Sequence, residues 1–510
     1  MVRLDRKRRV VGGIVGLASA GIALGIAELV AALTGPRSAP VIAVGGVVID
    51  SVPAPVKEFA ITTFGTHDKT ALLTGTFLLL AAFAVTIGVY ALRDIRIGYA
   101  GIAVFGLIGA AAAWSRPGLG FGSVFPSLIG AAAGAATMAA LVNGWRPPRP
   151  DLDTGEGRRT VLIGAVVALV GAGLAEVIGR QLGERSNVAA ARSAVVLPTP
   201  SDAPSALPTD AAVAGQSPFV TPAQNFYRID TALVVPQVDP TTWTLKIHGM
   251  VDRPMTLTYA QLLARPMISR YITLCCVSNP VGGNLIGNAL FLGAPLKDLL
   301  EEVGVHAGAD QVVGRSSDGF TAGSPTAVLM DGRDAMLAVG MNGEPLPTEH
   351  GFPVRVVVPG LYGYVSATKW ITELEVTTFA AFDAYWVQRD WVATGTIQTE
   401  SRIDTPSDGS TKAAGAVVIA GVAWAQHRGV SKVEVQVDNQ PWQTATLDPV
   451  PSTDTWRQWK INWNATSGRH ELRVRATDNS GQTQTSVVGD MVDGKYADST
   501  GYHQISVNIR

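Results

Sequence analysis

Apolar residues dominate the first third of the chain and then give way to short alternating runs. Five of the early runs are long enough, or nearly so, to cross a bilayer as helices, which takes about 20 residues. These runs are Val10–Leu33, Ala71–Leu92, Ile97–Trp114, Val124–Val142 and Thr160–Ile178. Val41–Val48 is also apolar but too short to span, so we expect a re-entrant or packed segment. The pattern predicts an all-α transmembrane region of about five helices over residues 1–180.

Basic residues predict the orientation of these helices. Residues 1–9 and the loop 146–159 are rich in arginine, and the short loop between the second and third runs is also basic. With these segments in the cytoplasm, five spans place the C-terminal half outside; an even number would place it inside. Arg158-Arg159 directly precede the last run. They have two interpretations, ordinary positive-inside charge or a twin-arginine export signal. We expect a multi-pass protein of a bacterial plasma membrane.

The predicted spans carry few groups that could do chemistry. None of the 7 histidines lies within a span, so a bis-histidine haem between these helices is excluded. Glu28 and Glu176 are near helix ends. The helices are therefore expected to serve as an anchor, with a quinone pocket left open as an alternative.

The second half predicts two domains after a linker. Residues 181–222 are rich in proline, alanine, serine and threonine, a composition typical of a semi-extended tether. Residues 223–402 mix short strand-like and helical runs, which predicts an α+β domain. The expected strands include Trp243–His248, Gln311–Gly314, Val354–Val358 and Ile371–Val376, and the expected helices are Tyr259–Ala264, Leu296–Val303 and Arg333–Val339.

Residues 403–510 alternate apolar and polar positions with a period of two, as half-buried strands do. The clearest such runs are Val417–Trp424, Lys432–Val437, Trp456–Trp463 and His470–Ala476. Regularly spaced strands over this length predict an all-β immunoglobulin-like sandwich. It has no cysteine pair, and its role on fold alone is support or association.

Charge and cysteine content narrow the chemistry. The formal net charge is -1, which indicates neither a nucleic acid nor an acidic partner. The only 2 cysteines are adjacent, Cys275 and Cys276, so no disulfide framework exists. On a strand they would face opposite ways, so one thiol can face a cleft while the other packs in the core. A turn rich in glycine, asparagine and proline follows, where a thiolate could act as a metal ligand or nucleophile.

Several motifs follow one another in the second half of the chain. In order they are Asn225-Phe-Tyr-Arg228, Cys276-Val-Ser-Asn279, Asn342-Gly-Glu-Pro-Leu-Pro347 and His350-Gly-Phe-Pro-Val-Arg355, followed by Gly363 and Lys369-Trp370. Together they resemble the sulfite oxidase-type molybdopterin oxidoreductases. The resemblance covers residues 225–510, and it implies a molybdopterin domain followed by a sandwich of the kind through which the family dimerises.

The resemblance also implies the site. Cys276 would be the ligand to molybdenum and, with Arg228, a catalytic residue. The implied cofactor contacts are Asn225, Phe226, Tyr227, Arg228, Asn279, Asp318, His350, Arg355, Ser366, Thr368 and Lys369. Their chemistry agrees, since an anionic pterin with a phosphate tail suits the guanidinium fork of Arg355 and the point charge of Lys369.

Each of these residues also has an ordinary structural interpretation. Cys275 is expected to pack in the core, because the family cysteine stands three residues before Asn279. Asp318 could be a turn aspartate as readily as a pterin contact. The arginines and lysine could be solvated surface charges.

Three positions depart from sulfite oxidase. Pro280 and Val281 follow Asn279 where the animal and plant enzymes have arginine, Phe291 replaces a substrate-site tryptophan, and Trp391 replaces a tyrosine. Fewer cations and more apolar surface suit a dianion poorly, so sulfite is doubtful. A neutral sulfoxide is at least as plausible, because the chain shares aromatic motifs with periplasmic methionine sulfoxide reductase.

We therefore predict a membrane-anchored molybdenum oxidoreductase that transfers oxygen atoms or performs a related redox step on a small molecule. Electrons would pass to a separate cytochrome or quinone, because the chain has no Cys-x-x-Cys-His motif and no iron–sulfur ligand set. Two alternatives remain open. Cys276 could be a covalent nucleophile without metal, or the chain could be a tethered scaffold or adhesion protein with a degenerate cofactor domain. The sandwich allows a homodimer.

Overall fold

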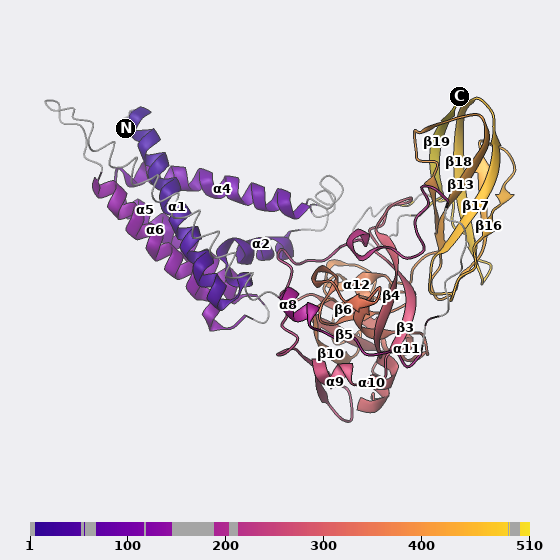
Figure 1. Cartoon of the computed structure of the whole chain (residues 1–510). Helices are drawn as coiled ribbons and strands as arrows, with labels where there is room; N and C mark the ends of the chain where they lie inside the picture. Colours follow the sequence, from indigo (N-terminus) through magenta and orange to yellow (C-terminus); the bar gives the residue numbers. More distant parts are fainter. Residues whose placement is uncertain are drawn as a thin grey trace. The chain divides into compact units, whose positions relative to one another are not determined.

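The computed structural model describes residues 6–52, 56, 68–116, 119–144, 188–202, 204, 213–487, 489 and 500–510. The chain divides into two compact units, which Figure 1 shows in indigo to purple and in magenta to yellow. The first comprises Met1–Asn187 with Thr231–Val235, and the second comprises Val188–Asp230 with Pro236–Arg510. The expected fifth span, Thr160–Ile178, lies outside the described residues.

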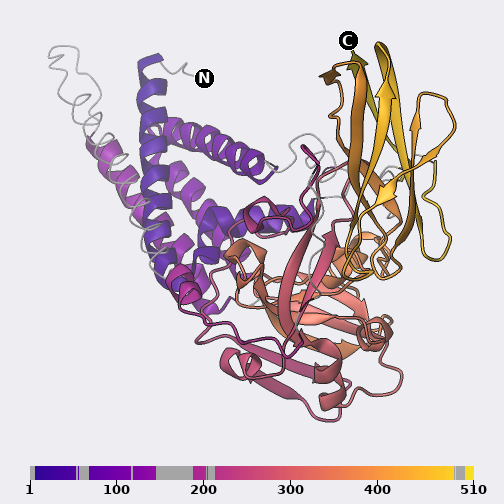
Figure 2. The same cartoon turned by 45° about the vertical axis from the view of Figure 1, so that its right-hand side comes forward.

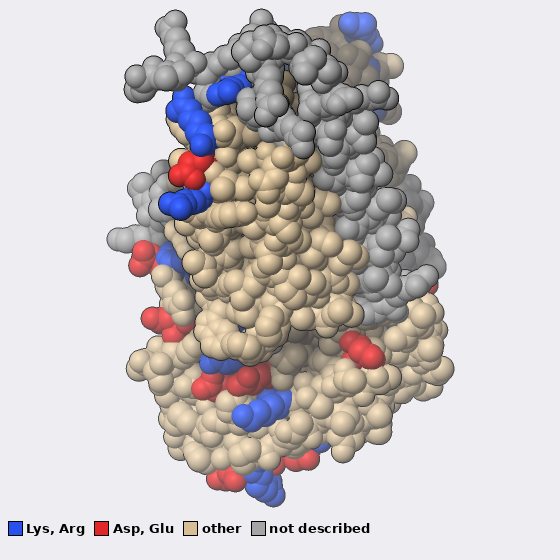
Figure 3. Space-filling view, turned by 90° about the vertical axis from the view of Figure 1, so that its left-hand side faces the viewer, with Lys and Arg blue, Asp and Glu red and all other residues tan. Residues whose placement is uncertain are grey.

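The first unit is helical. Its elements are α1 (Arg6–Thr34), η1 (Pro36–Ser38), α2 (Pro40–Ser51), α4 (Asp68–Ala91), α5 (Ile95–Trp114), η3 (Phe121–Val124) and α6 (Phe125–Gly144). Among the described helices, four are long and apolar enough to cross a membrane. They coincide with four of the five predicted runs, and α2 is the short apolar segment. Figure 3 shows a broad face over this unit without lysine, arginine, aspartate or glutamate.

Small residues let these helices approach one another closely. A side-chain carbon at Gly16 of α1 would lie 1.8 Å from the carbonyl oxygen of Ala84 on α4. One at Gly130 of α6 would lie 2.4 Å from the carbonyl oxygen of Ala23 on α1. In lipid, where apolar burial adds little, such close backbone contact is a main source of helix association.

The central part of the second unit is an α+β domain with two sheets. Its elements are α8 (Val188–Ser193), η4 (Ala223–Asn225), β1 (Thr244–Gly249), β2 (Met255–Thr258), α9 (Tyr259–Leu263), β3 (Ile268–Cys275), β4 (Ile286–Pro295), α10 (Leu296–Val303), β5 (Gln311–Ser316), β6 (Thr321–Pro325), α11 (Thr326–Met330), β7 (Met336–Met341), β8 (Glu344–Pro345), η5 (Thr348–His350), β9 (Arg355–Val357), α12 (Gly363–Ser366), β10 (Ile371–Thr377) and η6 (Val387–Arg389). One sheet has the order β2-β1-β10-β5-β6 and the other β3-β4-β7-β8, with β9 paired to β7. The expected strands and two of the three expected helices are present.

The third expected helix, Arg333–Val339, is wrong, because β7 occupies most of that range. Every residue of β7 is buried. Because successive side chains point to opposite faces, both faces of β7 are covered, while β4, β8 and β9 pair with it inside the sheet. A strand covered on both faces loses the alternating pattern, and periodicity then cannot distinguish it from a buried helix.

The C-terminal part of the second unit is a β-sandwich, seen in yellow in Figure 2. Its strands are β11 (Glu400–Thr405), β12 (Thr411–Lys412), β13 (Gly415–Trp424), β14 (Val430–Val437), β15 (Gln443–Thr444), β16 (Thr446–Leu447), β17 (Arg457–Ala465), β18 (Gly468–Asp478) and β19 (His503–Ile509). The two sheets have the orders β11-β13-β17-β16 and β12-β19-β18-β14-β15. Fully buried side chains such as Ile419, Trp459 and Val474 form the core of the sandwich. The predicted all-β domain is confirmed.

Parts of the expected tether lie on the second unit. Arg192 of α8 donates from Nε to the Leu346 carbonyl at 2.8 Å and forms an ion pair with Glu344. Further on, the Ser201 amide donates to the Met267 carbonyl at 2.8 Å. The segment is thus bound to the domain by backbone and side-chain hydrogen bonds, by ion pairs and by the buried side chain of Val188. Residues 181–187, 203 and 205–212 of this stretch lie outside the described residues.

Candidate functional site

The two cysteines lie where β3 ends at the edge of its sheet. Cys275, the last residue of β3, is buried in the hydrophobic core. Cys276 is half-buried and begins residues 276–285, which connect β3 to β4 and which we call the cysteine loop. The loop is closed by a hydrogen bond from the Cys276 amide to the Leu285 carbonyl at 2.9 Å. The predicted division of roles between the two thiols is consistent with this placement.

The environment of the Cys276 thiol combines burial with nearby donors. Burial raises the pKa of Cys276, and hydrogen bonds from Ser278 and the charge of Lys369 oppose that rise. Sequence reasoning missed Ser278, although it stands inside the Cys-x-x-Asn motif. A thiol kept neutral by burial is a poor nucleophile, whereas a bound cation would favour its thiolate. The site therefore suits metal ligation better than covalent catalysis.

Asn279 holds the cysteine loop and retains a free donor. Its Oδ1 accepts a hydrogen bond from the Leu285 amide at 2.8 Å. Its Nδ2 is buried and has no hydrogen-bond partner among the described residues. A buried amide donor without a partner costs free energy unless a ligand accepts its hydrogen bond.

His350, at the end of η5, has a definite proton arrangement. Its Nε2 donates to the Ala223 carbonyl at 3.0 Å, and its ring packs edge-on against Phe226. Nδ1 is therefore an acceptor, and it is buried without a partner in the described part of the chain. Burial, followed by the charges of Lys369 and Arg355, lowers the pKa of His350 to about 4, so the ring is neutral at pH 7. A neutral ring with a free buried acceptor suits a ligand that donates a hydrogen bond.

Arg355, on β9, is a buried cation that lacks a counter-charge. It is 3% exposed, and its Nη1 donates to the His350 carbonyl at 3.3 Å. No carboxylate of the described residues lies within ion-pair distance of its guanidinium. Burial lowers the pKa of Arg355 to about 10, and nearby Tyr227 opposes that effect. Since a buried unpaired charge is costly, the pocket favours an anionic ligand.

Lys369 and Arg228 share one carboxylate. Lys369 Nζ lies 3.0 Å from Asp230 Oδ2, and Arg228 Nε lies 2.9 Å from the same oxygen. Burial lowers the pKa of Lys369 to about 8, which Asp230 opposes, so the ammonium is still mostly charged at pH 7. Sequence reasoning missed Asp230, whose only signal is its place two residues after Arg228. The arrangement leaves one net positive charge, with Arg228 partly exposed.

Tyr227 connects the entry segment to the cysteines. Its ring stacks on Phe226 with centroids 5.3 Å apart. Burial raises the pKa of Tyr227, and the two cysteines raise it further, while Arg355 opposes them. The hydroxyl is therefore electrostatically close to Cys276 and to Arg355. Asn225, at the end of η4, is exposed.

Three of the expected cofactor contacts have backbone partners instead. The Ser366 hydroxyl donates to the Tyr362 carbonyl at 2.9 Å, and the Thr368 hydroxyl donates to the Gly314 carbonyl at 3.5 Å. Asp318 Oδ1 accepts from the Phe320 amide at 3.0 Å in the turn between β5 and β6. These contacts favour the turn interpretation of Asp318 and a structural role for both hydroxyls.

Comparisons with known proteins match both parts of the second unit. Residues 232–386 match the oxidoreductase molybdopterin binding domain, and residues 400–474 match the bacterial Ig domain. Relatives include mitochondrial sulfite oxidase of Rattus norvegicus, 29% identical over 340 residues, covering 57% of this chain and 62% of that protein. An NADH nitrate reductase of Oryza sativa subsp. japonica is 28% identical over 333 residues, covering 52% of this chain and 36% of that protein. The chain thus spans less than two thirds of these relatives.

A solved structure shares the fold of this unit. The sulfane dehydrogenase SoxCD of Paracoccus pantotrophus superimposes with a TM-score of 0.50 at 22% identity, over 58% of this chain and 84% of that one. The molybdopterin domain match contains Cys276, His350, Arg355 and Lys369, and begins just after Asp230. The buried acceptor, the buried donor and the unpaired cation fit the anionic, hydrogen-bonding cofactor that this domain binds.

Proposed function

Because this chain carries an oxidoreductase molybdopterin binding domain of the sulfite oxidase type, we propose that it is a membrane-anchored molybdenum enzyme acting outside the cytoplasm. Its reaction would be oxygen-atom transfer or a related two-electron step on a small molecule. The bound cofactor supplies that redox chemistry, and the chain supplies binding, orientation and charge. The observation that carries the proposal is the buried guanidinium of Arg355, which has no carboxylate within ion-pair distance among the described residues and donates to the carbonyl of His350 at 3.3 Å.

We assign Cys276 as the metal ligand. It is half-buried at a strand end, and its thiol would release a proton on binding a soft metal, as thiolate ligands do. Cys275 is unsuited to the role because its side chain lies in the core.

Each of the other residues would contact a different group of the anionic ligand. Arg355 and Lys369 would neutralise its charge, His350 Nδ1 would accept one of its N–H or O–H groups, and the Asn279 amide would donate to an acceptor. Arg228 would stand nearest the open positions, because it is the partly exposed member of the pair of cations on Asp230.

The anchor and the electron route follow from the first unit and from the composition. Four described helices support membrane attachment. An outward C-terminal half follows from the basic loops when the predicted run Thr160–Ile178, which lies outside the described residues, is counted as a fifth span. The chain has no haem-attachment motif, so electrons would pass to a separate cytochrome or quinone.

For the substrate we propose a sulfoxide or a similar neutral oxo-acceptor ahead of sulfite. Arg228 and Lys369 are already paired with Asp230, which leaves little free positive charge for a dianion. Phe291 stands where sulfite oxidases have a substrate-site tryptophan, and it is fully buried. Trp391 stands where they have a tyrosine, and it stacks on Trp386 with centroids 4.3 Å apart. Purified enzyme should reduce a dialkyl sulfoxide with an artificial electron donor faster than it oxidises sulfite with an artificial acceptor. Faster sulfite oxidation would contradict this choice.

The test of the proposal is metal and pterin content in matched cysteine variants. We expect about one molybdenum per chain in the unaltered protein, with pterin fluorescence after denaturation, as one cysteine ligand implies. Cys276→Ala should lose most of the metal. Cys275→Ala should retain it, because that side chain packs in the core.

The outcomes separate the alternatives. Metal loss in Cys275→Ala alone would move the ligand to that residue. A protein without molybdenum and pterin, made in a host that produces the cofactor, would contradict the enzyme and leave the scaffold. Covalent catalysis by Cys276 would be supported only if activity survived complete metal removal.

A further inference from the structure

The β-sandwich contacts the strand that leads into the cysteines. Among the described strands β3 pairs only with β4, and an isolated bridge joins its first residue, Ile268, to Asp202. On its free edge, the Thr273 amide donates to the Asp454 carbonyl at 2.9 Å, and Gln426 Nε2 donates to the Thr273 carbonyl at 3.2 Å. Asp454 and Gln426 both belong to loops of the sandwich. The sandwich thus supplies hydrogen-bond partners for both backbone groups of Thr273, two residues before Cys275.

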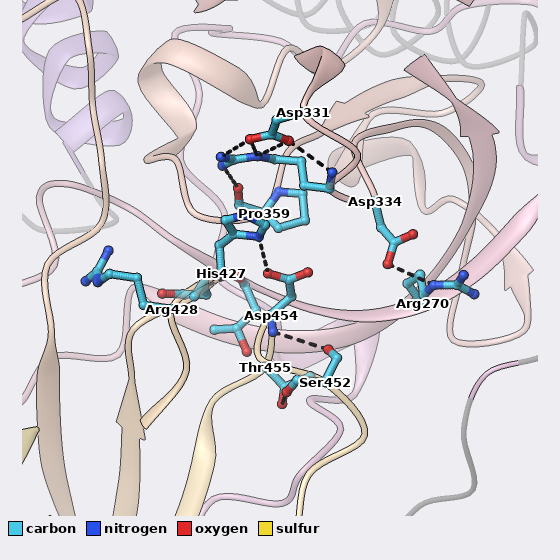
Figure 4. Close-up of polar contacts among 12 residues, drawn as sticks. Arg270, Asp331, Asp334, Pro359, His427, Arg428, Ser452, Asp454 and Thr455 are labelled. Carbon is cyan, nitrogen blue, oxygen red and sulfur yellow. Dashed lines mark hydrogen bonds and ion pairs between the residues drawn. The ribbon is translucent and has the colours of Figure 1, made fainter. Parts of the chain in front are cut away.

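The side chain of Thr273 strengthens this joint. It is fully buried, and its hydroxyl accepts from the Trp456 amide at 2.7 Å while donating to Asn288 Oδ1 at 3.0 Å. Withdrawal of the sandwich would leave all three polar groups of Thr273 short of a partner, which is costly for buried groups. Figure 4 shows the surrounding polar layer, in which His427 points toward Asp454.

A second contact between the sandwich and the cysteine loop lies after the two cysteines. Arg402 of β11 donates from Nη1 to the carbonyl of Gly283 in the cysteine loop. Its Nη2 donates to Ser217 Oγ at 2.9 Å, and its Nε donates to Asp404 Oδ1 at 2.6 Å. The side chains of Arg402 and Asp404 are only 10% and 7% exposed. All three guanidinium nitrogens are therefore engaged in a fixed fork, one arm of which holds the loop.

His503 of β19 supports the same turn from a second strand. Gly282 has φ +75, and a side-chain carbon there would lie 2.3 Å from the imidazole of His503. The imidazole is itself held, since its Nδ1 accepts from the Ile403 amide at 3.0 Å. The turn of the cysteine loop thus packs against His503 of β19, and His503 is itself held by β11.

We propose that the sandwich orients Cys276, the proposed metal ligand. Arg402 is the positioning residue that fixes the cysteine loop. A loop with Gly282, Gly283 and a proline has much conformational freedom to lose, and a metal ligand needs a fixed direction. Clamps at Thr273 and Gly283, on either side of Cys276, remove that freedom before the cofactor binds. The consequence at the metal rests on the proposed ligation by Cys276, whereas the clamp itself does not.

The test uses the full chain with Arg402→Gln, which removes the charge and the fork. In protein from a host that cannot make the cofactor, amide hydrogen exchange across residues 276–285 should become about tenfold faster or more, the factor for one charge-assisted hydrogen bond. In cofactor-loaded protein with equal molybdenum content, the thiolate-to-metal absorption band should shift or weaken. Arg402→Lys keeps the charge, with its donors on a single nitrogen and without the planar fork, and its exchange rate should lie between those of the unaltered protein and Arg402→Gln.

The matched control is Arg475→Gln. Arg475 lies in the same sandwich on β18, with its Nε 2.9 Å from Glu434 Oε2 and its guanidinium over Trp442. It should change exchange in the cysteine loop less than about twofold, because distant sites act independently. If Arg402→Gln does not fold, Arg402→Lys takes its place in both measurements.

Each outcome decides one point. Exchange in residues 276–285 that is no faster than in Arg475→Gln would overturn the clamp. Faster exchange with an unchanged absorption band would overturn the link to the metal. Absence of molybdenum from the unaltered protein would contradict the proposed function, and the exchange result would still decide whether Arg402 holds the loop.

Discussion

At the scale of single residues, the charges of the site are its most informative feature. Arg355 is buried without a carboxylate among the described residues, whereas other buried cations of this unit, such as Lys369, are paired. Evolution toward stability alone would not retain an unpaired buried guanidinium, because its desolvation is not repaid within the chain. The residue is better explained by a ligand than by the fold.

We expect Arg355→Met to separate stability from binding. In cofactor-free protein the variant should be as stable as the unaltered chain, or more stable by about 1 kcal/mol or more, because an uncompensated buried charge is removed. Cofactor content should fall at the same time. Thermal unfolding and pterin content measure the two effects.

Arg333→Met is the matched control. Arg333 pairs with Asp331 at 2.6 Å and donates to the Pro359 carbonyl at 2.8 Å, so its removal should destabilise the domain. If Arg355→Met were the more destabilising of the two in cofactor-free protein, Arg355 would have a structural role within the chain.

A second residue-scale prediction concerns Asp478, at the end of β18. Burial by itself would raise the pKa of this carboxyl, but hydrogen bonds from Ser480, Arg428, Thr399 and the Gln482 amide lower it to about 2. The carboxyl therefore stabilises the folded state by about 2 kcal/mol when ionised. Because the folded pKa is the lower one, this contribution is complete above pH 4 and is lost as pH falls toward 2.

The Asp478→Asn variant tests whether the ionised carboxyl stabilises the folded state. Denaturant unfolding of the sandwich at pH 7 should show a loss of about 2 kcal/mol, and the difference from the unaltered protein should narrow between pH 4 and pH 2. A difference that stays constant over this range would mean that shape, and not ionisation, accounts for the role of Asp478.

At the scale of elements, the packing of α1 depends on residues without side chains. Gly16→Leu should separate α1 from α4, because even one added carbon would lie 1.8 Å from the Ala84 carbonyl oxygen. The expected cost is about 1–3 kcal/mol or more, the usual range for overpacking. Thermal unfolding in detergent would measure it.

Gly75→Leu on α4 is the matched control, because a side-chain carbon at Gly75 meets no described atom within 4 Å. It should leave the stability of the helical unit within about 0.5 kcal/mol. Equal losses in both variants would show that helix propensity, and not contact, limits these positions.

The observed helices and strands also show which elements the apolar pattern of the sequence can predict. Helix α10 matches the expected range Leu296–Val303, because its apolar residues recur on one face while the other face is charged. Four strands of the sandwich, β13, β14, β17 and β18, match predicted runs, and burial alternates along β14 and β18 as expected for strands with one buried face. β7 was missed because a strand covered on both faces carries no period of two.

At the scale of the whole molecule, the second unit should be separable from the first. A chain of residues 188–510 should be soluble and should bind the cofactor, because its contacts are largely internal. A chain of residues 188–399 ends before β11 and lacks the sandwich, which leaves the backbone of Thr273 and the Gly283 carbonyl without these partners. It should aggregate or fail to bind the cofactor. Solubility and molybdenum content compare the two.

A cofactor-loaded chain of residues 188–399 would contradict the dependence of the site on the sandwich. Loss of the cofactor from residues 188–510 would instead show that the helical unit contributes to the site. The two truncations therefore test different boundaries.

The sequence by itself determined the apolar spans and the all-β period of the last part. The cysteine motif and its arginine, lysine and histidine partners were predicted from the resemblance of short motifs to a family. These signals are local, since each rests on residue type and spacing within about a dozen positions. Only the tertiary structure decided that Asp230 serves Lys369 as well as Arg228, and that Arg402 reaches Gly283. Such contacts join residues separated by up to 139 positions in the first case and 119 in the last, and no local pattern encodes which distant carbonyl or carboxylate a side chain will meet.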